Sequence, residues 1–405
     1  MSTATAPQGT QNPSATTSFG SPAFSGDWRT EWHEFEGATY LNTAGMAAMP
    51  KVSLKAVQAA LEAKKFPHLR DEATAFYEVP NRLRANLATL IGAQPEEIAL
   101  TTGASSGVIA VAEALAWKPG DEVLTGRGEF PLQYTCWKPM EEREGISVKI
   151  VPQAGKFITA DDVIAALTPR TRVVSISHVR FDDSTLLDAA RVAEACHKQG
   201  ALLLLDVSQS CGAVPMDLRK LGADFAVCAG YKWLLGAFGT GFFWIKRELL
   251  ASVRPAPFYW MAVAGAHDFA KLDFSEPKPE ASAARWDAPE WASHFNFNLA
   301  ALDAGVEFVL RAKPETALAH NHQLIDSMLA RLPADRCVAA SPLDSKLRGP
   351  YGCFVARTPE KTVELYKKLR EEKVFTSLRE GRIRVSPYLF NTIQDIDRLI
   401  SVITT

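Results

Sequence analysis

The sequence lacks the cysteine patterns that mark disulfide frameworks and zinc sites. Its six cysteines include no C-x-x-C pair and no Cys/His spacing typical of zinc, and they lie at positions 136, 196, 211, 228, 337 and 353. Cys228 falls in an apolar run and Cys196 in a helical pattern. We therefore expect mostly small core side chains in a reducing compartment, which indicates a cytoplasmic protein, and we expect no metal site.

The net charge is also small, and long apolar runs are missing. The 405 residues carry a formal net charge of only -2, which gives no electrostatic reason to expect a nucleic acid or an acidic membrane as a partner. No stretch approaches the ~20 consecutive apolar residues of a membrane-spanning helix. Residues 1–26 contain no charge and resemble neither a secretory signal nor a transit peptide, so we expect a disordered tail there.

The glycine motifs of common nucleotide sites are absent as well. No G-x-G-x-x-G follows a predicted strand, and G-x-x-x-x-G-K-[ST] occurs nowhere in the sequence. These absences argue against a non-catalytic nucleotide-binding α/β protein, a hypothesis that a dinucleotide titration would test. An apolar content of 47% with 22% charged residues is instead typical of a globular chain long enough to bury a substantial core.

The sequence does contain a dense block of apolar runs between positions 201 and 246. One run ends in Asp206, and a second, Phe225 to Gly230, leads directly into Tyr231 and Lys232. Such runs, with helical pattern between them, predict strands of a parallel sheet that is buried on both faces. Ligands bind at the carboxyl ends of such strands, which is where both Asp206 and Lys232 are expected.

Lys232 has two interpretations on its residue context alone. Burial at a strand end disfavours the charged form and makes the amine nucleophilic, as a Schiff-base lysine must be. A single lysine more often begins a surface helix and points into water. The presence of Asp206, Gln209 and the glycine-rich turn 236–241 at comparable strand ends favours the first interpretation.

Two motifs in this block resemble the pyridoxal-phosphate lysine region of the class V aminotransferase family. They are D-x-x-Q, from Asp206 to Gln209, and G-Y-K-W-L-L-G, from Gly230 to Gly236. The family also holds cysteine desulfurases, selenocysteine lyases and isopenicillin N epimerase-like proteins, and the resemblance runs from about Tyr40 to Leu399. It implies the fold type I of pyridoxal-phosphate transferases. That is an α/β fold whose large domain has a mainly parallel seven-stranded sheet flanked by helices, with a smaller α+β C-terminal domain.

The resemblance also implies a division of the chain. After the tail at 1–26, we expect a segment 27–44 that packs with the small domain, a large cofactor-binding domain over 45–290 and the small domain over 291–405. The irregular stretch 255–297 is too long for an ordinary loop, and we expect it to decide substrate identity. Within it, residues 285–288 only partly match the family motif that reaches the partner subunit's phosphate, so that contact is not assigned.

The cofactor implied by the resemblance is pyridoxal 5'-phosphate, bound by Lys232 as an aldimine. Asp206 would pair with the pyridine nitrogen. The turn at 102–107 leads from a strand into a helix and would hold the phosphate at Ala104 and Ser105, since such a turn presents free N–H groups. An ordinary serine helix cap is the alternative for this turn.

Four further residues are expected around the cofactor ring. Phe130, in a Glu-Phe-Pro variant typical of the epimerase-like branch, would stack on the ring, although it could also be a core aromatic. Gln209 would bond the ring oxygen. Tyr231 stands where many members have a histidine near the phosphate. Asp183 is the nearest substitute for the family's cofactor-contacting asparagine, and a solvated loop carboxylate is its alternative.

Two residues are expected to bind the substrate. Arg384 lies in the segment R-I-R-V-S-P at 382–387, which resembles the family's C-terminal motif, and its guanidinium would hold the α-carboxylate in bidentate fashion. Pairing with a surface acid is the alternative. Asn42 lies in the stretch 40–50, which resembles the loop that reaches the substrate side of the cofactor, although a turn before a helix would explain the same residues.

The resemblance specifies the reaction less well than the family. Desulfurases and selenocysteine lyases carry a mobile-loop cysteine near the stretch between Phe375 and Arg384, and none of the six cysteines lies there. Transamination of an amino acid with a keto acid is therefore the leading hypothesis, because it needs only the lysine, the cofactor and a carboxylate clamp. β-Elimination or epimerisation is the alternative. Family members also lead us to expect a homodimer with its active sites at the interface.

Overall fold

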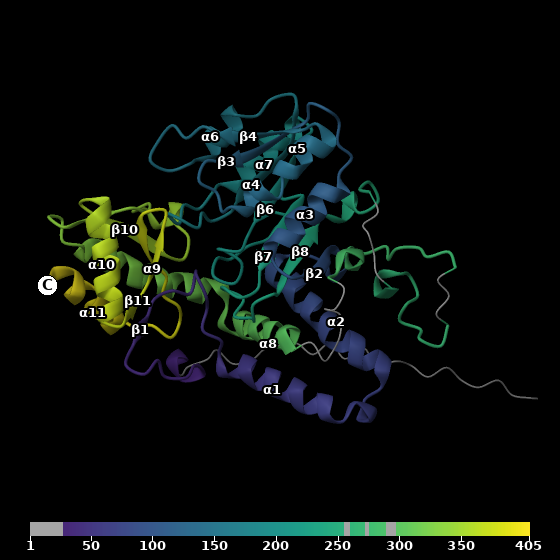
Figure 1. Cartoon of the computed structure of the whole chain (residues 1–405), viewed down its shortest axis with the longest axis horizontal. Helices are drawn as coiled ribbons and strands as arrows, with labels where there is room; N and C mark the ends of the chain where they lie inside the picture. Colours follow the sequence, from purple (N-terminus) through teal and green to yellow (C-terminus); the bar gives the residue numbers. More distant parts are fainter. Residues whose placement is uncertain (1–26, 255–259, 272–274, 289–296) are drawn as a thin grey trace, which may run out of the picture.

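A seven-stranded sheet forms the centre of the protein (Figure 1). The computed structural model describes residues 27–254, 260–271, 275–288 and 297–405. In spatial order the strands are β2 (Ile98–Thr101), β8 (Gly241–Ile245), β7 (Phe225–Ala229), β6 (Leu202–Asp206), β5 (Thr171–Ser177), β3 (Glu122–Gly126) and β4 (Ser147–Val151). β8 is antiparallel to β2 and β7, and the other neighbours are parallel. The predicted α/β fold with a mainly parallel sheet is confirmed.

Both faces of the sheet are buried against helices. Successive residues of a strand point to opposite faces, so neighbouring residues belong to different cores. Leu203 and Leu205 of β6 pack into a core shared with α2, α7 and α8, whereas Leu204 packs into a core shared with α3 and α5. The helices of this part of the chain are α2 (Glu72–Ile91), α3 (Ala104–Ala114), α4 (Leu132–Thr135), α5 (Lys138–Glu144), α6 (Ala160–Ala165), α7 (Ala189–Lys198) and α8 (Phe297–Ala312). A further helix, α1 (Lys51–Lys65), lies along α8 (Figure 1).

The prediction of a helical pattern between β6 and β7 is wrong. Residues 207–224 form a succession of turns. Pro215 disfavours helical geometry in the residue before it. Gly212 adopts a φ of 97°, and a Cβ at this position would meet the carbonyl of Trp233. The segment is therefore shaped by its close approach to the turn after β7.

The C-terminal region forms a second, smaller α+β unit, as predicted. Its antiparallel sheet has the order β12 (Ser377–Arg379), β13 (Arg382–Val385), β10 (Gly352–Ala356) and β9 (Cys337–Ala339). The helices α9 (Pro314–Arg331), α10 (Pro359–Glu371) and α11 (Ile393–Thr404) belong to the same region.

The N-terminal end of the described chain pairs with this C-terminal region. β1 (Thr39–Tyr40) is parallel to β11 (Val374–Phe375), and Thr39 Oγ1 donates a hydrogen bond of 3.3 Å to Asp395 Oδ1. The exact limits proposed for the domains stay predictions. The proposed tail at 1–26 and the boundary near 290 lie outside the described residues.

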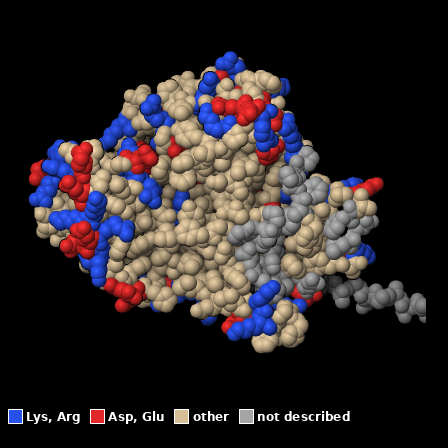
Figure 2. Space-filling model, in the orientation of Figure 1, with Lys and Arg blue, Asp and Glu red and all other residues tan. Residues whose placement is uncertain are grey.

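The strands β2, β3, β5, β6 and β7 all point the same way, so their carboxyl ends meet at one edge of the sheet. The loops that follow them supply the polar residues described below. Figure 2 shows that charged side chains gather towards the periphery of the face in view and are sparse across its middle. Among the described helices, none is both long enough and apolar enough to cross a membrane.

Candidate active site

Lys232 lies in a tight turn directly after β7. The turn is closed by a hydrogen bond of 2.9 Å from Gly236 N to Gly230 O, and Leu235 adopts a left-handed φ of 58°. The Lys232 side chain is buried, with 8% of its surface exposed. Its Nζ forms no hydrogen bond or ion pair with any residue in the described ranges, and it lies 5.5 Å from the centre of the Phe130 ring.

The environment of Lys232 favours the neutral amine. Burial lowers the pKa of Lys232 from 10.5 to about 8, although the negative charge of Asp206 opposes this shift. The positive charge of Arg384 lowers the pKa further. Near neutral pH a much larger fraction of the Lys232 amine is therefore uncharged than in an ordinary lysine, and the uncharged form is the one that attacks a carbonyl carbon.

Asp206 is the last residue of β6, the strand that pairs with β7. Its side chain is buried, and Oδ1 accepts a hydrogen bond of 2.8 Å from Ser208 N. Ser208 Oγ in turn accepts a hydrogen bond from Ala229 N, which ties the loop after β6 to the end of β7. The strand pairing thus brings the predicted carboxylate and the predicted lysine to neighbouring strand ends.

The N-terminus of α3 faces the same cavity. Its cap residue, Gly103, has a φ of 150° and provides no side chain to bond the N–H groups of the first turn. A Cβ on Gly241 of β8 would meet Gly103, so the turn and β8 are packed closely. The N–H groups at Ala104 and Ser105 are therefore presented at the positive end of the helix dipole, as an anion requires.

These elements enclose a cavity of about 180 Å³. Six of the residues expected around the cofactor line it, namely Ala104, Ser105, Phe130, Asp206, Tyr231 and Lys232. Phe130 also packs edge-on against Phe181, with ring centres 5.3 Å apart. Burial raises the pKa of Tyr231, and the charge of Asp206 adds to this effect, so that the Tyr231 hydroxyl keeps its proton.

Gln209 and Asn42 lie beside the cavity, in contact with the N-terminal loop. Gln209 Nε2 donates to Ala44 O at 3.1 Å, and Gln209 Oε1 accepts from Trp233 Nε1 at 3.0 Å. Asn42 pairs with Ser386, the residue after β13, and its buried Oδ1 has no hydrogen-bond partner among the described residues. Gln209 thus holds the loop with both ends of its amide, and neither residue is among those that line the cavity.

Arg384 lies on β13, and only 1% of its surface is exposed. Its Nε donates to Ser377 Oγ at 3.1 Å, and its Nη1 donates to Phe181 O at 2.8 Å. No described acid lies within ion-pair distance of it, which removes the alternative of a surface ion pair within these ranges. Burial lowers the pKa of Arg384, and a bound carboxylate would offset this cost.

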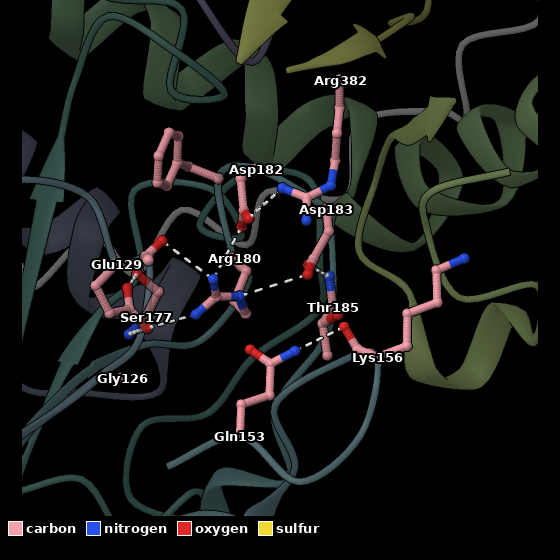
Figure 3. A network of polar contacts seen from close by, with 12 residues as sticks. Gly126, Glu129, Gln153, Lys156, Ser177, Arg180, Asp182, Asp183, Thr185 and Arg382 are labelled. Atoms are coloured by element: carbon pink, nitrogen blue, oxygen red, sulfur yellow. Dashed lines mark hydrogen bonds and ion pairs between the residues drawn. The ribbon is translucent and has the colours of Figure 1, made fainter. Parts of the chain in front are cut away.

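Asp183 belongs to a different group, a buried network around Arg180 (Figure 3). Arg180 contacts Glu129 at 3.5 Å, Asp182 at 3.2 Å and Asp183 at 3.6 Å, and Arg382 reaches Asp182 from β13 at 2.7 Å. Figure 3 shows Arg180 lying between Glu129 on one side and the two aspartates on the other. The structure therefore places Asp183 in this network and not among the residues that line the cavity.

The network supports the loop that carries Phe130. Glu129 precedes Phe130 and accepts a hydrogen bond from Ser177 N at 3.3 Å. Burial raises the pKa of Glu129 to about 7, although the positive charge of Arg180 opposes the shift. Sequence reasoning missed this network, because the partners come from loops far apart in the chain. The only local signal was the carboxylate of Glu129 beside the expected aromatic.

Other residues of the cavity wall were also missed. Leu132 and Ser208 line the cavity as well, whereas the remaining lining residues, Thr102, Gly103, Ser106 and Ala229, belong to the expected turn at 102–107 or to the end of β7. Ser208 could have been noticed because it lies between the two matched residues of the D-x-x-Q motif. A larger hollow, of about 560 Å³, lies on the C-terminal region between residues of β9, α10 and α11, away from the strand ends.

Cysteine and metal chemistry find no support in this cavity. None of the cysteines is among its lining residues, and all but the half-buried Cys136 are buried. No cluster of three or more His, Cys, Asp or Glu side chains arranged to hold a metal occurs in the part of the chain that the structure describes.

The residues that line the cavity fit pyridoxal phosphate. The uncapped N-terminus of α3 suits the phosphate, the Asp206 carboxylate suits a protonated pyridine nitrogen and the unpaired Lys232 amine suits the aldehyde. The three chemical features of the cofactor therefore each find a complementary group in one cavity.

Comparison with known proteins agrees with this geometry. A family model described as aminotransferase class-V matches residues 39–399. An isopenicillin N epimerase from Streptomyces clavuligerus is 27% identical over 400 residues, covering 91% of this chain and 96% of that protein. An uncharacterized aminotransferase, YcbU, from Bacillus subtilis is 24% identical over 322 residues, covering 79% of this chain and 82% of that one.

Solved structures share the fold. The complex of the cystine C-S lyase C-DES with its product cysteine persulfide matches with a TM-score of 0.80 and 22% identity, covering 91% of this chain and 97% of that chain. The cysteine desulfurase CsdA from Escherichia coli matches with a TM-score of 0.78 and 19% identity, covering 93% of this chain and 96% of that chain. At this level of identity the likeness establishes the fold, and it confirms the predicted fold type I.

Proposed function

Because the chain belongs to the class V aminotransferase family, a family of pyridoxal-phosphate-dependent enzymes, we propose that it is a transaminase that moves the α-amino group of an amino acid to a keto acid. The observation that carries the proposal is the unpaired amine of Lys232, whose pKa of about 8 lies close to physiological pH. Membership of an enzyme family also argues against the non-catalytic nucleotide-binding alternative.

The lining residues would divide the binding of the cofactor between them. The first turn of α3, at Ala104 and Ser105, would hold the phosphate, Asp206 would bond the pyridine nitrogen and Lys232 would attach to the aldehyde carbon. When bound, pyridoxal phosphate supplies an electron-accepting ring that stabilises negative charge at the substrate Cα. Phe130 would cover one face of the ring and exclude water from it.

Lys232 is suited to carry a proton once a substrate has displaced it. Its Nζ is free of protein partners, and an amine with a pKa of about 8 both takes and returns a proton near neutral pH. Transamination needs only one such group, which would take the proton from the substrate Cα and later give it back. Lys232 is the one amine among the residues that line the cavity.

Arg384 would orient the substrate. Its Nη2 donates to no described residue, whereas Nε and Nη1 are held by Ser377 and Phe181. The guanidinium is therefore fixed in position and still offers a donor to the α-carboxylate. Asn42, whose Oδ1 is buried without a partner, is the second residue that we assign to the substrate side. Asp183 and Gln209 remain proposed cofactor contacts, although each already has partners within the protein.

Epimerisation or β-elimination is the second candidate function. Tyr231 favours it, because its protonated hydroxyl lies at the cavity and would supply the second acid that inversion of the Cα requires. Similarity to an isopenicillin N epimerase over 91% of the chain points the same way. Desulfuration is less well supported, since no described cysteine lines the cavity.

Product chemistry distinguishes these reactions. The purified enzyme loaded with pyridoxal phosphate would be mixed with single amino acids, first without and then with a keto acid. Transamination converts the bound cofactor to its aminated form and releases a keto acid in one half-reaction. Pyruvate with ammonia would indicate elimination, and an inverted substrate would indicate epimerisation; either result with no keto-acid-dependent turnover would contradict the proposal.

We further propose a cytoplasmic homodimer. Sparse charge across the middle of the face in Figure 2 supports a subunit interface, as do exposed apolar side chains such as Met46, Ile109 and Phe238. The six cysteines are all free, which suits a reducing compartment. Size-exclusion chromatography with light scattering would measure the molar mass of the protein in solution. A monomer at micromolar concentration would contradict the proposed dimer.

A further inference from the structure

The hairpin of β12 and β13 presents three arginines on one face. Its register pairs Ser377 with Arg384 and Arg379 with Arg382. Because side chains alternate along each strand and directly paired residues share a side, these four residues lie on the same face of the hairpin. Ser377 and Arg384 are buried, and Arg384 contacts the loop after β5, whereas Arg379 is exposed next to the turn that connects the two strands.

The three arginines differ in their partners. Arg382 forms an ion pair of 2.7 Å with Asp182, as Figure 3 shows. Arg384 donates to Ser377 Oγ and to Phe181 O, which are both uncharged. Arg379 donates only to the carbonyl of its neighbour Leu378, at 2.8 Å, and pairs with no acid in the described part of the chain. Two positive charges on this face are therefore not neutralised.

Both unpaired arginines act on the active site. Burial and Asp206 raise the pKa of Tyr231, and the positive charges of Arg379 and Arg384 oppose this rise. Both also contribute to lowering the pKa of Lys232, although burial is the main cause there. The hairpin face that carries Arg379 also carries Arg384, whose partner Phe181 packs against Phe130 in the cavity wall. Across the cavity, Asp206 is the one carboxylate among the lining residues.

We infer that the substrate is an amino acid whose side chain ends in a second carboxylate, with Arg384 holding the α-carboxylate and Arg379 holding the side-chain carboxylate. This inference rests on the proposed function, because it concerns the substrate of the same site. Arg379 suits the role because its guanidinium is exposed and offers free donors. The buried Arg384 would bind the α-carboxylate, which all amino acids share. The exposed Arg379, on the same hairpin, would bind the side chain, which differs between amino acids.

The test compares matched acidic and neutral substrates. Holoenzyme would be mixed with glutamate and glutamine, and with aspartate and asparagine, and the spectral change of the bound cofactor would give kcat/KM for each. The variants are Arg379→Gln, which removes the charge at similar length, and Arg379→Lys, which keeps the charge. Arg247→Gln is the matched control, since Arg247 is exposed and follows the end of β8 that lies farthest from Gly103.

We expect Arg379→Gln to lower kcat/KM for the acidic substrates by about 10- to 100-fold, the value of a hydrogen bond to a charged group, and to leave the neutral ones within about threefold. Arg379→Lys should retain part of the acidic preference, and Arg247→Gln should change nothing. An equal effect of Arg379→Gln on acidic and neutral substrates, or no acidic preference in the wild type, would overturn the inference.

A binding measurement checks the same point without turnover. The holoenzyme would be titrated in a calorimeter with glutarate, which has two carboxylates, and with pentanoate, which has one carboxylate on a carbon chain of the same length. Glutarate should bind about 10-fold or more tightly, and Arg379→Gln should remove the difference. If amino acids convert the cofactor but glutarate has no advantage, this inference fails and the proposed function stands. If no amino acid converts it, the proposed function fails as well.

Discussion

Arg180 and Arg384 are both buried arginines beside the same loop, and they have opposite surroundings. Burial alone would lower the pKa of Arg180, but Glu129, Asp182 and Asp183 outweigh this effect and raise it. Burial lowers the pKa of Arg384, and no described acid compensates. A buried cation enclosed by carboxylates stabilises the fold, whereas one that lacks them keeps its capacity for a ligand.

Lys232 belongs with Arg384 in this comparison, since its amine also lacks a protein partner. Lys232→Ala should therefore remove function without removing stability. We expect borohydride to trap no cofactor on the protein and turnover to fall by about 10⁴-fold, because the variant loses both the covalent attachment and the proton carrier. Absorbance of the bound cofactor and the urea midpoint would be measured together.

Trapping that persists in Lys232→Ala would show that another amine binds the cofactor. A large loss of stability would show that Lys232 has a structural role like that of Arg180, and not a ligand-binding role like that of Arg384.

Replacing Arg180 should have the opposite effect. Arg180→Met leaves Glu129, Asp182 and Asp183 buried without the cation between them, and breaking a buried ion pair in this way costs about 3–5 kcal/mol. Urea unfolding would measure the loss. Arg143→Met is the matched control, because its pair with Glu113 is exposed to solvent and contributes little to stability. An equal, small effect of the two variants on the free energy of unfolding would show that Arg180 does not have the structural role described above.

Arg384→Met should separate activity from stability most clearly. We expect kcat/KM to fall by about 10- to 100-fold, the value of a lost hydrogen bond to a charged group, while the urea midpoint stays level or rises. Arg384→Lys should recover part of the activity, since it keeps the charge but not the fork of donors. If Arg384→Met unfolds as easily as Arg180→Met, then Arg384 is a structural residue.

Glu129 should make the network around Arg180 sensitive to pH. The folded pKa of Glu129, about 7, lies above its ordinary value of 4.5, so the folded state binds more protons between these values. Its contribution to stability is complete below pH 4.5 and is lost as the pH rises to 7, by about 3 kcal/mol in all. Urea unfolding of the wild type and of Glu129→Gln across this range would give the difference.

The wild type must be compared with Glu129→Gln at each pH, because titration of His178 changes the stability in the opposite direction. Burial lowers the pKa of His178 to about 4, below its ordinary value of 6.5, so its contribution to stability grows as the pH rises between these values. The wild-type curve alone can therefore be flat. Parallel curves for the wild type and Glu129→Gln would show that Glu129 titrates normally.

The sequence allowed most of the sheet and half of the site to be predicted. Continuous apolar runs located β6 and β7 closely, because strands buried on both faces leave a dense local signal. Lys232 and Asp206 could be placed at the same edge of the sheet because each follows such a run directly. The lack of a helix between β6 and β7 was missed, because the contact between Gly212 and Trp233 that shapes this segment is not local.

The second half of the site depends on contacts that no local pattern reveals. Arg384 binds the carbonyl of Phe181, 203 positions away, and Arg382 binds Asp182, 200 positions away. The sequence therefore could not tell that Glu129 joins Arg180, 51 positions away, or that Gln209 holds the N-terminal loop at Ala44. Those roles follow from packing between distant segments and need coordinates.

The pairing of β1 with β11 has a consequence for synthesis of the enzyme in the cell. Thr39 bonds Asp395, 356 positions further on, so the two ends of the described chain meet in the folded protein. During translation β1 therefore stays unpaired until Val374 and Phe375 have left the ribosome. The loop that begins at Asn42 reaches the active site from this strand, so a nascent chain that already holds a folded sheet is still an incomplete catalyst.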